Sequence, residues 1–147
     1  LMVVGEDSLR ERAKHLAHQL GIEKSVEFIG SQPYDEMPRL FSIADIFVLP
    51  SVPTRTWEEQ YGMVLVEAMA SGKALISTRT GAIPEVVGPA GMMVPPRQPN
   101  RLYEAMRELA ISGQKREELG FIARSMAIER YDSRHVAGTL SSIYDSI

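Results

Sequence analysis

Short apolar runs alternate along the chain with longer segments whose apolar residues recur every three to four positions. The short runs predict β-strands, and they lie at residues 1–5, 26–29, 45–49, 74–77 and 92–94. The longer segments predict helices, and they lie at residues 9–20, 35–44, 62–71, 84–87, 100–111, 115–129 and 133–146. Strands that alternate with helices are typical of a parallel sheet covered on both faces. The pattern therefore predicts an α/β fold that ends in three helices.

Residues at the ends of these segments support the predicted bounds. Ser8 is expected to cap the first helix, because Glu11 follows it by three positions as in a capping box. Gly21 is expected to end that helix in a left-handed conformation. No internal repeat or linker interrupts the pattern, so we predict one domain over residues 1–147.

Composition and charge exclude several classes of protein. The chain is 44% apolar and 24% charged, which is typical of a folded globular protein. Its 16 basic and 19 acidic residues give a net charge of −3 without a basic face, so nucleic acid is not an expected partner. The chain lacks cysteine and its three histidines are scattered, so we predict no metal site. No run reaches the roughly 18 apolar residues that span a bilayer, which favours a soluble, cytoplasmic domain.

The first residues give information about the parent protein. Residues 1–5 resemble the end of a buried strand, with no start codon or signal peptide before them. We therefore expect this chain to be a fragment, preceded in its parent by at least one more strand and by a further domain.

Two loops that follow predicted strands are candidates for ligand binding. Residues 51–61 form a strand-to-helix connection far longer than the two to six residues typical of such loops. Residues 78–82 form the second loop, in which Gly81 permits close approach of the backbone to a ligand. Because ligands of parallel sheets bind beyond the carboxyl ends of the strands, both loops are expected to face one crevice.

The helix that begins at Gly62 is expected to direct its first amides toward this crevice. The unpaired amides of Gly62, Met63 and Val64 attract an anion such as phosphate, assisted by the helix dipole. A glycine at this position would let a phosphoryl oxygen approach the backbone, although glycine at the start of a helix often serves the backbone alone.

Two carboxylates are predicted to enter the crevice from different directions. Glu67 lies in the second turn of an otherwise apolar helix, and Glu59 lies on the long, mobile loop. Carboxylates accept paired hydrogen bonds from vicinal hydroxyls while amides hold a diphosphate, a combination that suits a sugar nucleotide. A solvated surface position for Glu67 and the acid–base pair of a hydrolase are the alternatives, and the anion-seeking amides disfavour the hydrolase.

Other side chains of the two loops have two interpretations each. Trp57 and Tyr61 either stack on the ligand or anchor the loop to the domain, and we favour the anchor. Arg55 and Arg79 either contact phosphate or the acceptor, or are simply solvated as exposed loop arginines usually are.

Three ordered motifs resemble a known family. They are Leu49-Pro50-Ser51, the segment 59–72 with two glutamates separated by seven residues, and the segment 81–87. With residues 91–96 and the terminal helices, they resemble the C-terminal, donor-binding half of a retaining GT-B glycosyltransferase of the family 4 (group 1) type. The resemblance covers nearly the whole chain, and it implies a Rossmann-like sheet that forms one half of a GT-B fold.

The resemblance also implies a role for each candidate residue. Glu67 would hold the ribose hydroxyls, and Glu59, the candidate catalytic residue, would contact the donor sugar near the reacting centre. The remaining nucleotide-sugar contacts would be the amides of Gly62, Met63 and Val64, then Gly81 near the pyrophosphate, and Gly30 and Ser31 near the base. The expected partner is a nucleoside diphosphate sugar, with no cofactor and no metal, because cations and helix amides stabilise the leaving group.

Parts of such an enzyme would lie outside this chain. The phosphate-clamping Arg and Lys and the N-terminal acceptor domain would precede Leu1, so the fragment alone is expected to be inactive. Contact with the inner membrane surface, which many relatives make, would belong mostly to that missing half. Ala82 stands where the family often has a second glycine, and its methyl group is expected to alter the floor of the site.

Two other functions fit part of the pattern. A GT-B nucleotide-sugar epimerase uses a similar crevice, and product analysis of the parent would distinguish it. A non-catalytic α/β ligand-sensing module needs only the layered fold, but it has no need of a long loop that carries a glutamate.

Overall fold

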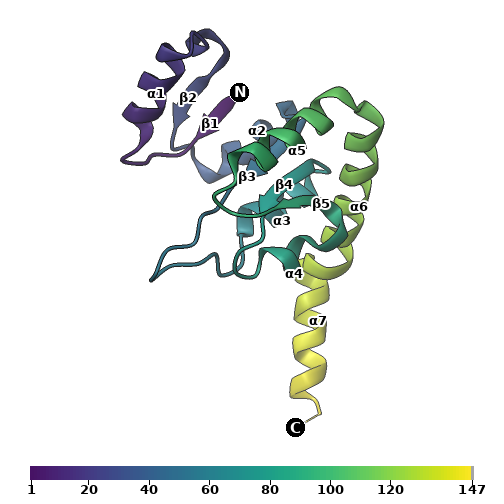
Figure 1. Ribbon diagram of the computed structural model, residues 1–147. Helices are drawn as coiled ribbons and strands as arrows, with labels where there is room; N and C mark the ends of the chain where they lie inside the picture. The colour runs from purple at the N-terminus through teal and green to yellow at the C-terminus, as the bar shows by residue number, and fades with distance from the viewer. Residues whose placement is uncertain (147) are drawn as a thin grey trace. The chain divides into compact units, whose positions relative to one another are not determined.

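The computed structural model describes residues 1–146, and the chain forms two compact units, Leu1–Leu40 and Phe41–Ile147. The described residues contain five strands, all paired in parallel, as labelled in Figure 1. They form two sheets, β1-β2 in the first unit and β3-β4-β5 in the second. The α/β class is confirmed, with its strands divided between two sheets.

In the first unit, β1 (Met2–Val4) pairs with β2 (Glu27–Gly30), and α1 (Arg10–Gln19) connects them. Two short 3-10 helices, Glu23–Ser25 and Tyr34–Glu36, lie on either side of β2. The predicted cap at Ser8 is wrong: the Leu9 amide donates to Asp7 Oδ1 at 2.7 Å, and the Ser8 hydroxyl also donates to Asp7. A carboxylate is a stronger acceptor than a hydroxyl. Gly21 has a φ of 66°, which confirms the predicted left-handed stop.

The second unit is built on a three-stranded sheet with β4 (Ala74–Thr78) between β3 (Ile46–Leu49) and β5 (Gly91–Val94). All five residues of β4 are buried, as expected of a central parallel strand. The register pairs Leu49 with Ser77 and Thr78 with Val94. The three strands therefore end at the same edge, and the two predicted loops leave β3 and β4 from that edge.

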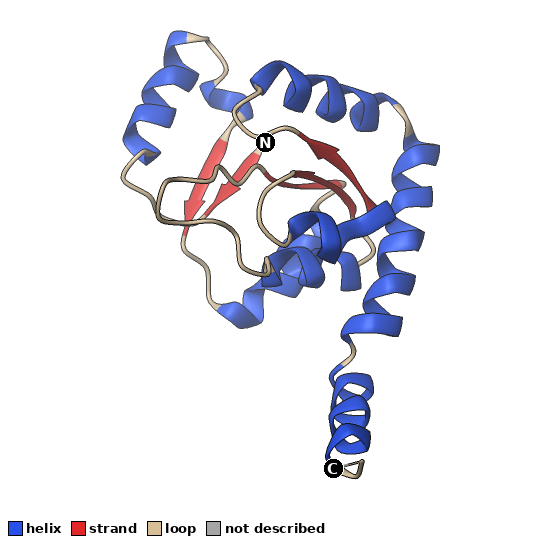
Figure 2. Ribbon diagram, turned by 60° about the horizontal axis from the view of Figure 1, so that its bottom comes forward, coloured by secondary structure: helices blue, strands red, loops and turns tan. Residues whose placement is uncertain are grey.

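Helices cover this sheet, as Figure 2 shows around the red strands. They are α3 (Met63–Ala70), α4 (Ile83–Val87), α5 (Pro99–Ile111) and α6 (Gly113–Tyr131). Helix α7 (Ser133–Tyr144) contacts α6 and extends away from the sheet in Figure 1, and α2 (Met37–Ile43) spans the boundary of the units. One face of the sheet packs on α5 through Ile76, Val94 and Leu109. Because side chains alternate along a strand, Leu75 and Ser77 point to the opposite face. The predicted layered architecture is confirmed.

Helix α6 fixes the turn that joins α3 to β4. It packs against both elements, and a Cβ added at Gly120 would overlap the carbonyl oxygen of Gly72. The Arg124 guanidinium donates to the Ala70 carbonyl at 2.8 Å, which satisfies an acceptor at the end of α3. The position of α3 relative to the sheet is therefore set by packing along its length and by a hydrogen bond at its end.

Candidate functional site

The long loop between β3 and α3, residues 50–62, is called the strap, and its first part is held by hydroxyls of β4. The Ser77 hydroxyl donates to the Leu49 carbonyl at 2.7 Å, and the Thr78 hydroxyl donates to the Ser51 carbonyl at 2.6 Å. Both donors lie in the buried central strand. The start of the strap is thus attached to the rigid sheet.

The middle of the strap is held by an internal turn and by one arginine. Thr54 Oγ1 accepts hydrogen bonds from the amides of Thr56 and Trp57, and the Thr54 amide donates to the Trp57 carbonyl at 2.8 Å. The Arg97 guanidinium donates to the Pro53 carbonyl at 2.6 Å. Arg97 has a φ of 58°, an unfavourable conformation for a residue with a Cβ. The strap was predicted to be mobile, and the structure shows it hydrogen-bonded at several points.

The last part of the strap lies directly on the 78–82 loop. The Gly81 amide donates to Glu58 Oε1 at 3.1 Å, and the Ala82 amide donates to the Glu59 carbonyl at 3.1 Å. Gly81 has a φ of 52°, and a Cβ added there would overlap the Glu59 carbonyl oxygen. The absence of a side chain at residue 81 is therefore required by the strap itself. The expected pyrophosphate contact of Gly81 stays a prediction.

Glu59 also holds the start of α3. Its Oε1 accepts a hydrogen bond from the Gly62 amide at 3.1 Å. Gly62 is buried and left-handed, with a φ of 74°, and a Cβ there would lie 2.8 Å from Leu65 Cδ1. The structure thus gives Gly62 a backbone role, and one oxygen of the Glu59 carboxylate is already engaged.

The next two amides of α3, those of Met63 and Val64, have no acceptor within residues 1–146. The first amides of a helix have no partner in a preceding turn, and the Gly62 carbonyl accepts from Leu65 instead. No other group among residues 1–146 accepts a hydrogen bond from either amide. Both are free to bind an anion, whereas the third amide predicted for this role, that of Gly62, is already engaged by Glu59 Oε1.

Helix α3 buries one face and presents Glu67 on the other. Leu65, Ala68 and Met69 are buried, and at about 100° per residue they share one side of the helix. Glu67 falls on the opposite side with Met63, whose side chain is 60% exposed. The Glu67 carboxylate is half-buried, and no group among residues 1–146 pairs with it. It is a free acceptor on a fixed helix, about one turn from the Met63 amide.

Gly30 and Ser31 belong to the first unit. Gly30 ends β2 with a φ of 73°, is buried, and accepts a hydrogen bond from the Gly5 amide at 2.8 Å. A Cβ there would lie 2.7 Å from Glu6 Oε1, and Arg10 pairs with this carboxylate. Ser31 is exposed. The expected contact of these residues with the base stays a prediction.

The aromatic residues of the strap differ in their environment. Tyr61 packs edge-to-face on Tyr131, with ring centroids 6.2 Å apart, and the Tyr131 hydroxyl donates to the Val86 carbonyl at 2.9 Å. Burial raises the pKa of Tyr131 above its usual value, and the neighbouring Tyr61 adds to this. Tyr61 therefore serves as an anchor, as predicted. Trp57 is 50% exposed.

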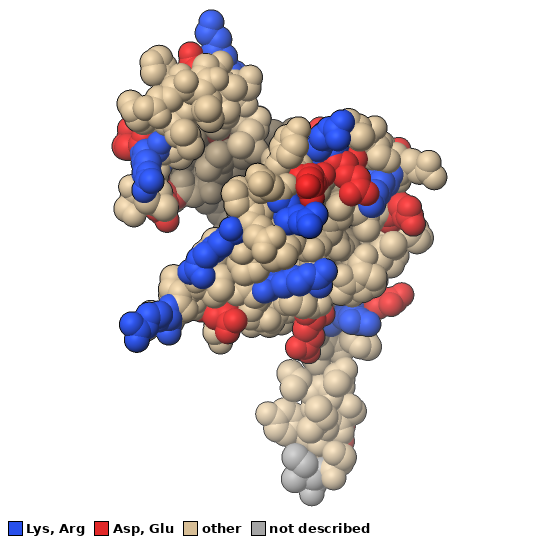
Figure 3. Space-filling view, viewed as in Figure 1, with Lys and Arg blue, Asp and Glu red and all other residues tan. Residues whose placement is uncertain are grey.

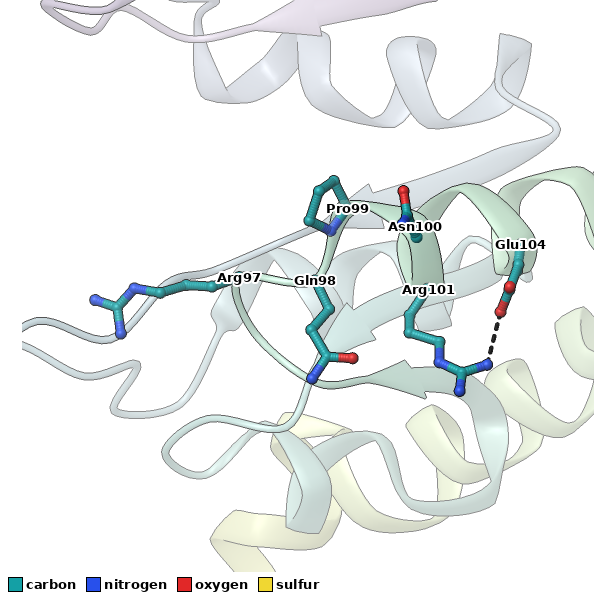
Figure 4. A pocket seen from close by; sticks show the side chains of 6 residues that line it. All are labelled: Arg97, Gln98, Pro99, Asn100, Arg101 and Glu104. Carbon is teal, nitrogen blue, oxygen red and sulfur yellow. Dashed lines mark hydrogen bonds and ion pairs between the residues drawn. The ribbon is translucent and has the colours of Figure 1, made fainter.

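A separate hollow of about 490 Å³ lies at the start of α5 (Figure 4). It is lined by Arg97, Gln98, Pro99, Asn100, Arg101 and Glu104. Arg101 points toward Glu104 and pairs with it at 2.9 Å, and Arg97 is engaged by the strap. None of the predicted site residues lines this hollow.

Charged side chains do not form a single basic surface on the face shown in Figure 3, where Lys and Arg are interspersed with Asp and Glu. Within residues 1–146, no three His, Asp or Glu side chains are grouped as metal ligands. The expectation that the function needs no metal stays a prediction. No helix in the described part is long and apolar enough to cross a membrane.

Comparison with known proteins gives a consistent result. The family model for glycosyl transferases group 1 matches residues 1–126. The chain is 31% identical over 139 residues to D-inositol 3-phosphate glycosyltransferase of Corynebacterium jeikeium, an alignment that covers 93% of this chain and 32% of that protein. It is 34% identical over 146 residues to spore coat protein SA of Bacillus subtilis, covering 96% of this chain and 37% of that protein.

Solved structures with this fold are also similar. Anabaena HepE in complex with UDP superposes with a TM-score of 0.78 at 28% identity, covering 96% of this chain and 40% of that one. Sucrose-phosphate synthase from Thermosynechococcus elongatus superposes with a TM-score of 0.83 at 24% identity, covering 99% of this chain and 38% of that one, which shows a shared fold.

The chain belongs to the glycosyl transferases group 1 family, and its α/β fold is of the GT-B type. This confirms the resemblance that the glutamate spacing and flanking motifs indicated. The chain spans about a third of the length of the curated relatives described above. The family match favours a glycosyltransferase domain over the alternative of a non-catalytic ligand-sensing module.

Sequence reasoning missed three residues of this site. Thr78 and Arg97 hold the strap in place, and the Glu58 side chain extends from the strap to accept from the Gly81 amide. Glu58 is adjacent to the predicted site residue Glu59, but the Gly81 amide that donates to it is 23 positions away in the sequence. The long-range partner of each residue is not encoded in local spacing.

Proposed function

We propose that residues 1–147 form the donor-binding domain of a retaining glycosyltransferase that transfers a hexose-type sugar from a nucleoside diphosphate sugar. The observation that carries the proposal is the Glu67 carboxylate on α3, which lies about one turn from the Met63 and Val64 amides and, like them, has no partner among residues 1–146. An unpaired acceptor beside unpaired donors is the arrangement that vicinal hydroxyls and a phosphate would satisfy together. HepE, a structural neighbour, was solved with UDP-glucose as well as UDP.

Glu67 is assigned to the ribose hydroxyls, because a carboxylate on a packed helix accepts hydrogen bonds without a change in the backbone. The amides of Met63 and Val64 are assigned to the sugar and phosphate oxygens, assisted by the helix dipole. Gly81 is assigned to the pyrophosphate, and Gly30 and Ser31 to the base.

Glu59 is assigned to the donor sugar. One of its oxygens accepts from the Gly62 amide at 3.1 Å, and the second oxygen is left to accept from a sugar hydroxyl near the reacting carbon. This contact fixes the carboxylate before the ligand arrives, which lowers the entropy cost of binding. Helix amides and cations, rather than a metal, stabilise the leaving nucleoside diphosphate.

The complete sugar-transfer activity is assigned to the full-length parent protein. An N-terminal domain would supply the acceptor site and the phosphate-clamping Arg and Lys, and it would make any contact with the inner face of the membrane. Sugar transfer is accordingly expected from the parent in the cytoplasm and not from residues 1–147 alone.

The test is a binding titration of UDP, GDP and ADP, followed by calorimetry with the matching nucleotide sugar. Glu67→Ala is expected to weaken both nucleotide and nucleotide sugar by roughly ten- to a hundredfold, as for loss of hydrogen bonds to a charged group. Glu59→Ala is expected to weaken only the nucleotide sugar. Glu117→Gln, on the exposed part of α6, is the control for loss of one negative charge. If Glu67→Ala binds nucleotide as tightly as the unsubstituted chain does, the assignment of Glu67 to the ribose is wrong.

A further inference from the structure

The Gly81 amide is already occupied by an internal anion. Glu58 Oε1 accepts its hydrogen at 3.1 Å, across 23 positions of sequence. Hydrogen bonds from a backbone amide to an ionised carboxylate are stronger than those to a neutral acceptor. A carboxylate on this amide therefore occupies the place that a phosphoryl oxygen would take.

Both groups are accessible to a competitor. Gly81 and Glu58 are each exposed, and the amide lies just beyond the carboxyl end of β4, where ligands of parallel sheets bind. A carboxylate that leaves this amide would be hydrated at once, so the exchange costs little beyond the lost bond.

The strap does not depend on this contact for its position. The Ala82 amide holds the Glu59 carbonyl, the Thr78 hydroxyl holds the Ser51 carbonyl, and the Arg97 guanidinium holds the Pro53 carbonyl. These three attachments involve backbone carbonyls of the strap and no side chain of Glu58. Glu58 is therefore free to move while the strap stays in place.

We infer that Glu58 is an intramolecular competitor that the diphosphate of the donor displaces from the Gly81 amide. The inference rests on the proposed function, because that function assigns the amide to the pyrophosphate. The hydrogen bond between Glu58 and Gly81 lowers the fraction of molecules whose Gly81 amide is free for the diphosphate. The apparent dissociation constant of the donor rises in proportion. Because the Glu58 carboxylate moves away from the Gly81 amide, its negative charge does not keep repelling the bound diphosphate.

The test compares Glu58→Ala and Glu58→Asp with the unsubstituted chain of 147 residues. Alanine removes the carboxylate. Aspartate keeps the charge but shortens the side chain by one methylene, so we expect its carboxylate to lose the hydrogen bond to the Gly81 amide while the Ala82 amide holds the strap. The readout is the dissociation constant of UDP, GDP and ADP at up to millimolar concentration, followed through the amide resonances of Gly81 and Met63 by nuclear magnetic resonance.

Both variants are expected to bind the preferred nucleoside diphosphate about fivefold more tightly, as for removal of one exposed hydrogen bond to a charged group. Tighter binding by Glu58→Ala alone would make the effect one of net charge and would overturn the inference. Unchanged or weaker binding by both variants would also overturn it while leaving the proposed function intact. If no nucleoside diphosphate shifts these resonances in any variant, the proposed function fails for this chain, and the inference fails with it.

Discussion

The strap and helix α3 each carry one of the two glutamates that are separated by seven residues, and they hold them by different means. On α3, packing of Leu65, Ala68 and Met69 fixes the backbone, and the Glu67 carboxylate is left without a partner in the described part of the chain. On the strap, where none of residues 50–61 is fully buried, Glu59 contributes its own carboxylate and carbonyl to backbone amides. A rigid element can leave a polar group free for a ligand, whereas a loop uses part of its polar groups to hold itself in place.

The largest loss of stability is expected when the strap is displaced from the 78–82 loop. Gly81→Ala would place a Cβ on the Glu59 carbonyl oxygen and would add strain at a φ of 52°. We expect a loss of about 2–3 kcal/mol in the free energy of unfolding, from left-handed strain and the displaced strap. Urea denaturation is the measurement.

Gly138→Ala is the matched control for that substitution. A Cβ at Gly138 meets nothing within 4 Å, and this glycine lies inside α7. Because alanine favours helix more than glycine does, the control is expected to unfold at the same or a higher urea concentration. Equal losses at positions 81 and 138 would contradict the close contact between strap and loop.

The two glutamates are expected to differ in their effect on stability. Glu59→Ala removes the acceptor of the Gly62 amide and is expected to cost about 1 kcal/mol, as for loss of a helix cap. Glu67→Ala removes an unpaired carboxylate and is expected to change stability by less than about 0.5 kcal/mol. Thermal or urea unfolding of both variants without ligand is the measurement. A larger loss for Glu67→Ala would mean that the carboxylate does hold the fold.

The aromatic anchor at the end of the strap gives a comparable, pH-dependent effect. Tyr131→Phe keeps the ring against Tyr61 but removes the donor to the Val86 carbonyl, and it is expected to cost about 1 kcal/mol at neutral pH. The pKa of Tyr131 is raised in the folded state. The stability contributed by its neutral form is present below the ordinary tyrosine pKa and is lost as pH rises through the folded pKa.

Urea denaturation from neutral pH to above the tyrosine pKa is the measurement for this anchor. Tyr131→Phe is expected to show less loss of stability in the alkaline range than the unsubstituted chain. Identical pH profiles would show that Tyr131 ionises freely in the folded state.

The smallest effect is expected in the loop that carries Gly81. Thr80 is 4% exposed, and its hydroxyl has no partner among residues 1–146. Thr80→Val replaces this hydroxyl by a methyl group of similar shape, so we expect no loss of stability or a slight gain. A clear loss in urea denaturation would indicate that the hydroxyl is hydrogen-bonded in solution.

Sequence patterns predicted the helices and strands of this fold well, because the spacing of apolar residues places them on the face of each element that becomes buried. The strand at Ala74–Thr78 was predicted as residues 74–77, and α3 was predicted to begin at Gly62, which proves to be its cap. Gly21, which ends α1, was likewise predicted from its neighbours alone. Local chemistry was sufficient in each case.

Contacts between distant residues were not predictable in the same way. The pairing of Glu58 with Gly81 and of Arg97 with Pro53 depends on where two loops meet after the sheet has formed. Ser8 was predicted as the cap of α1 from its spacing to Glu11, but the helix begins at Arg10 with Leu9 at its N-cap position, and the Leu9 amide donates to Asp7 Oδ1. The expected effect of the Ala82 methyl group on the floor of the site stays a prediction, and the Ala82 amide donates to the Glu59 carbonyl at an ordinary φ of −80°.

The contact between the Glu59 carbonyl and residue 81 has a consequence for protein engineering. A designer who transplants residues 50–62 into a related scaffold must transplant the glycine at position 81 with them, or the graft will be pushed outward by the first side chain that it meets. Libraries that randomise one of these segments alone are expected to yield mostly misfolded loops, whereas joint randomisation samples compatible pairs.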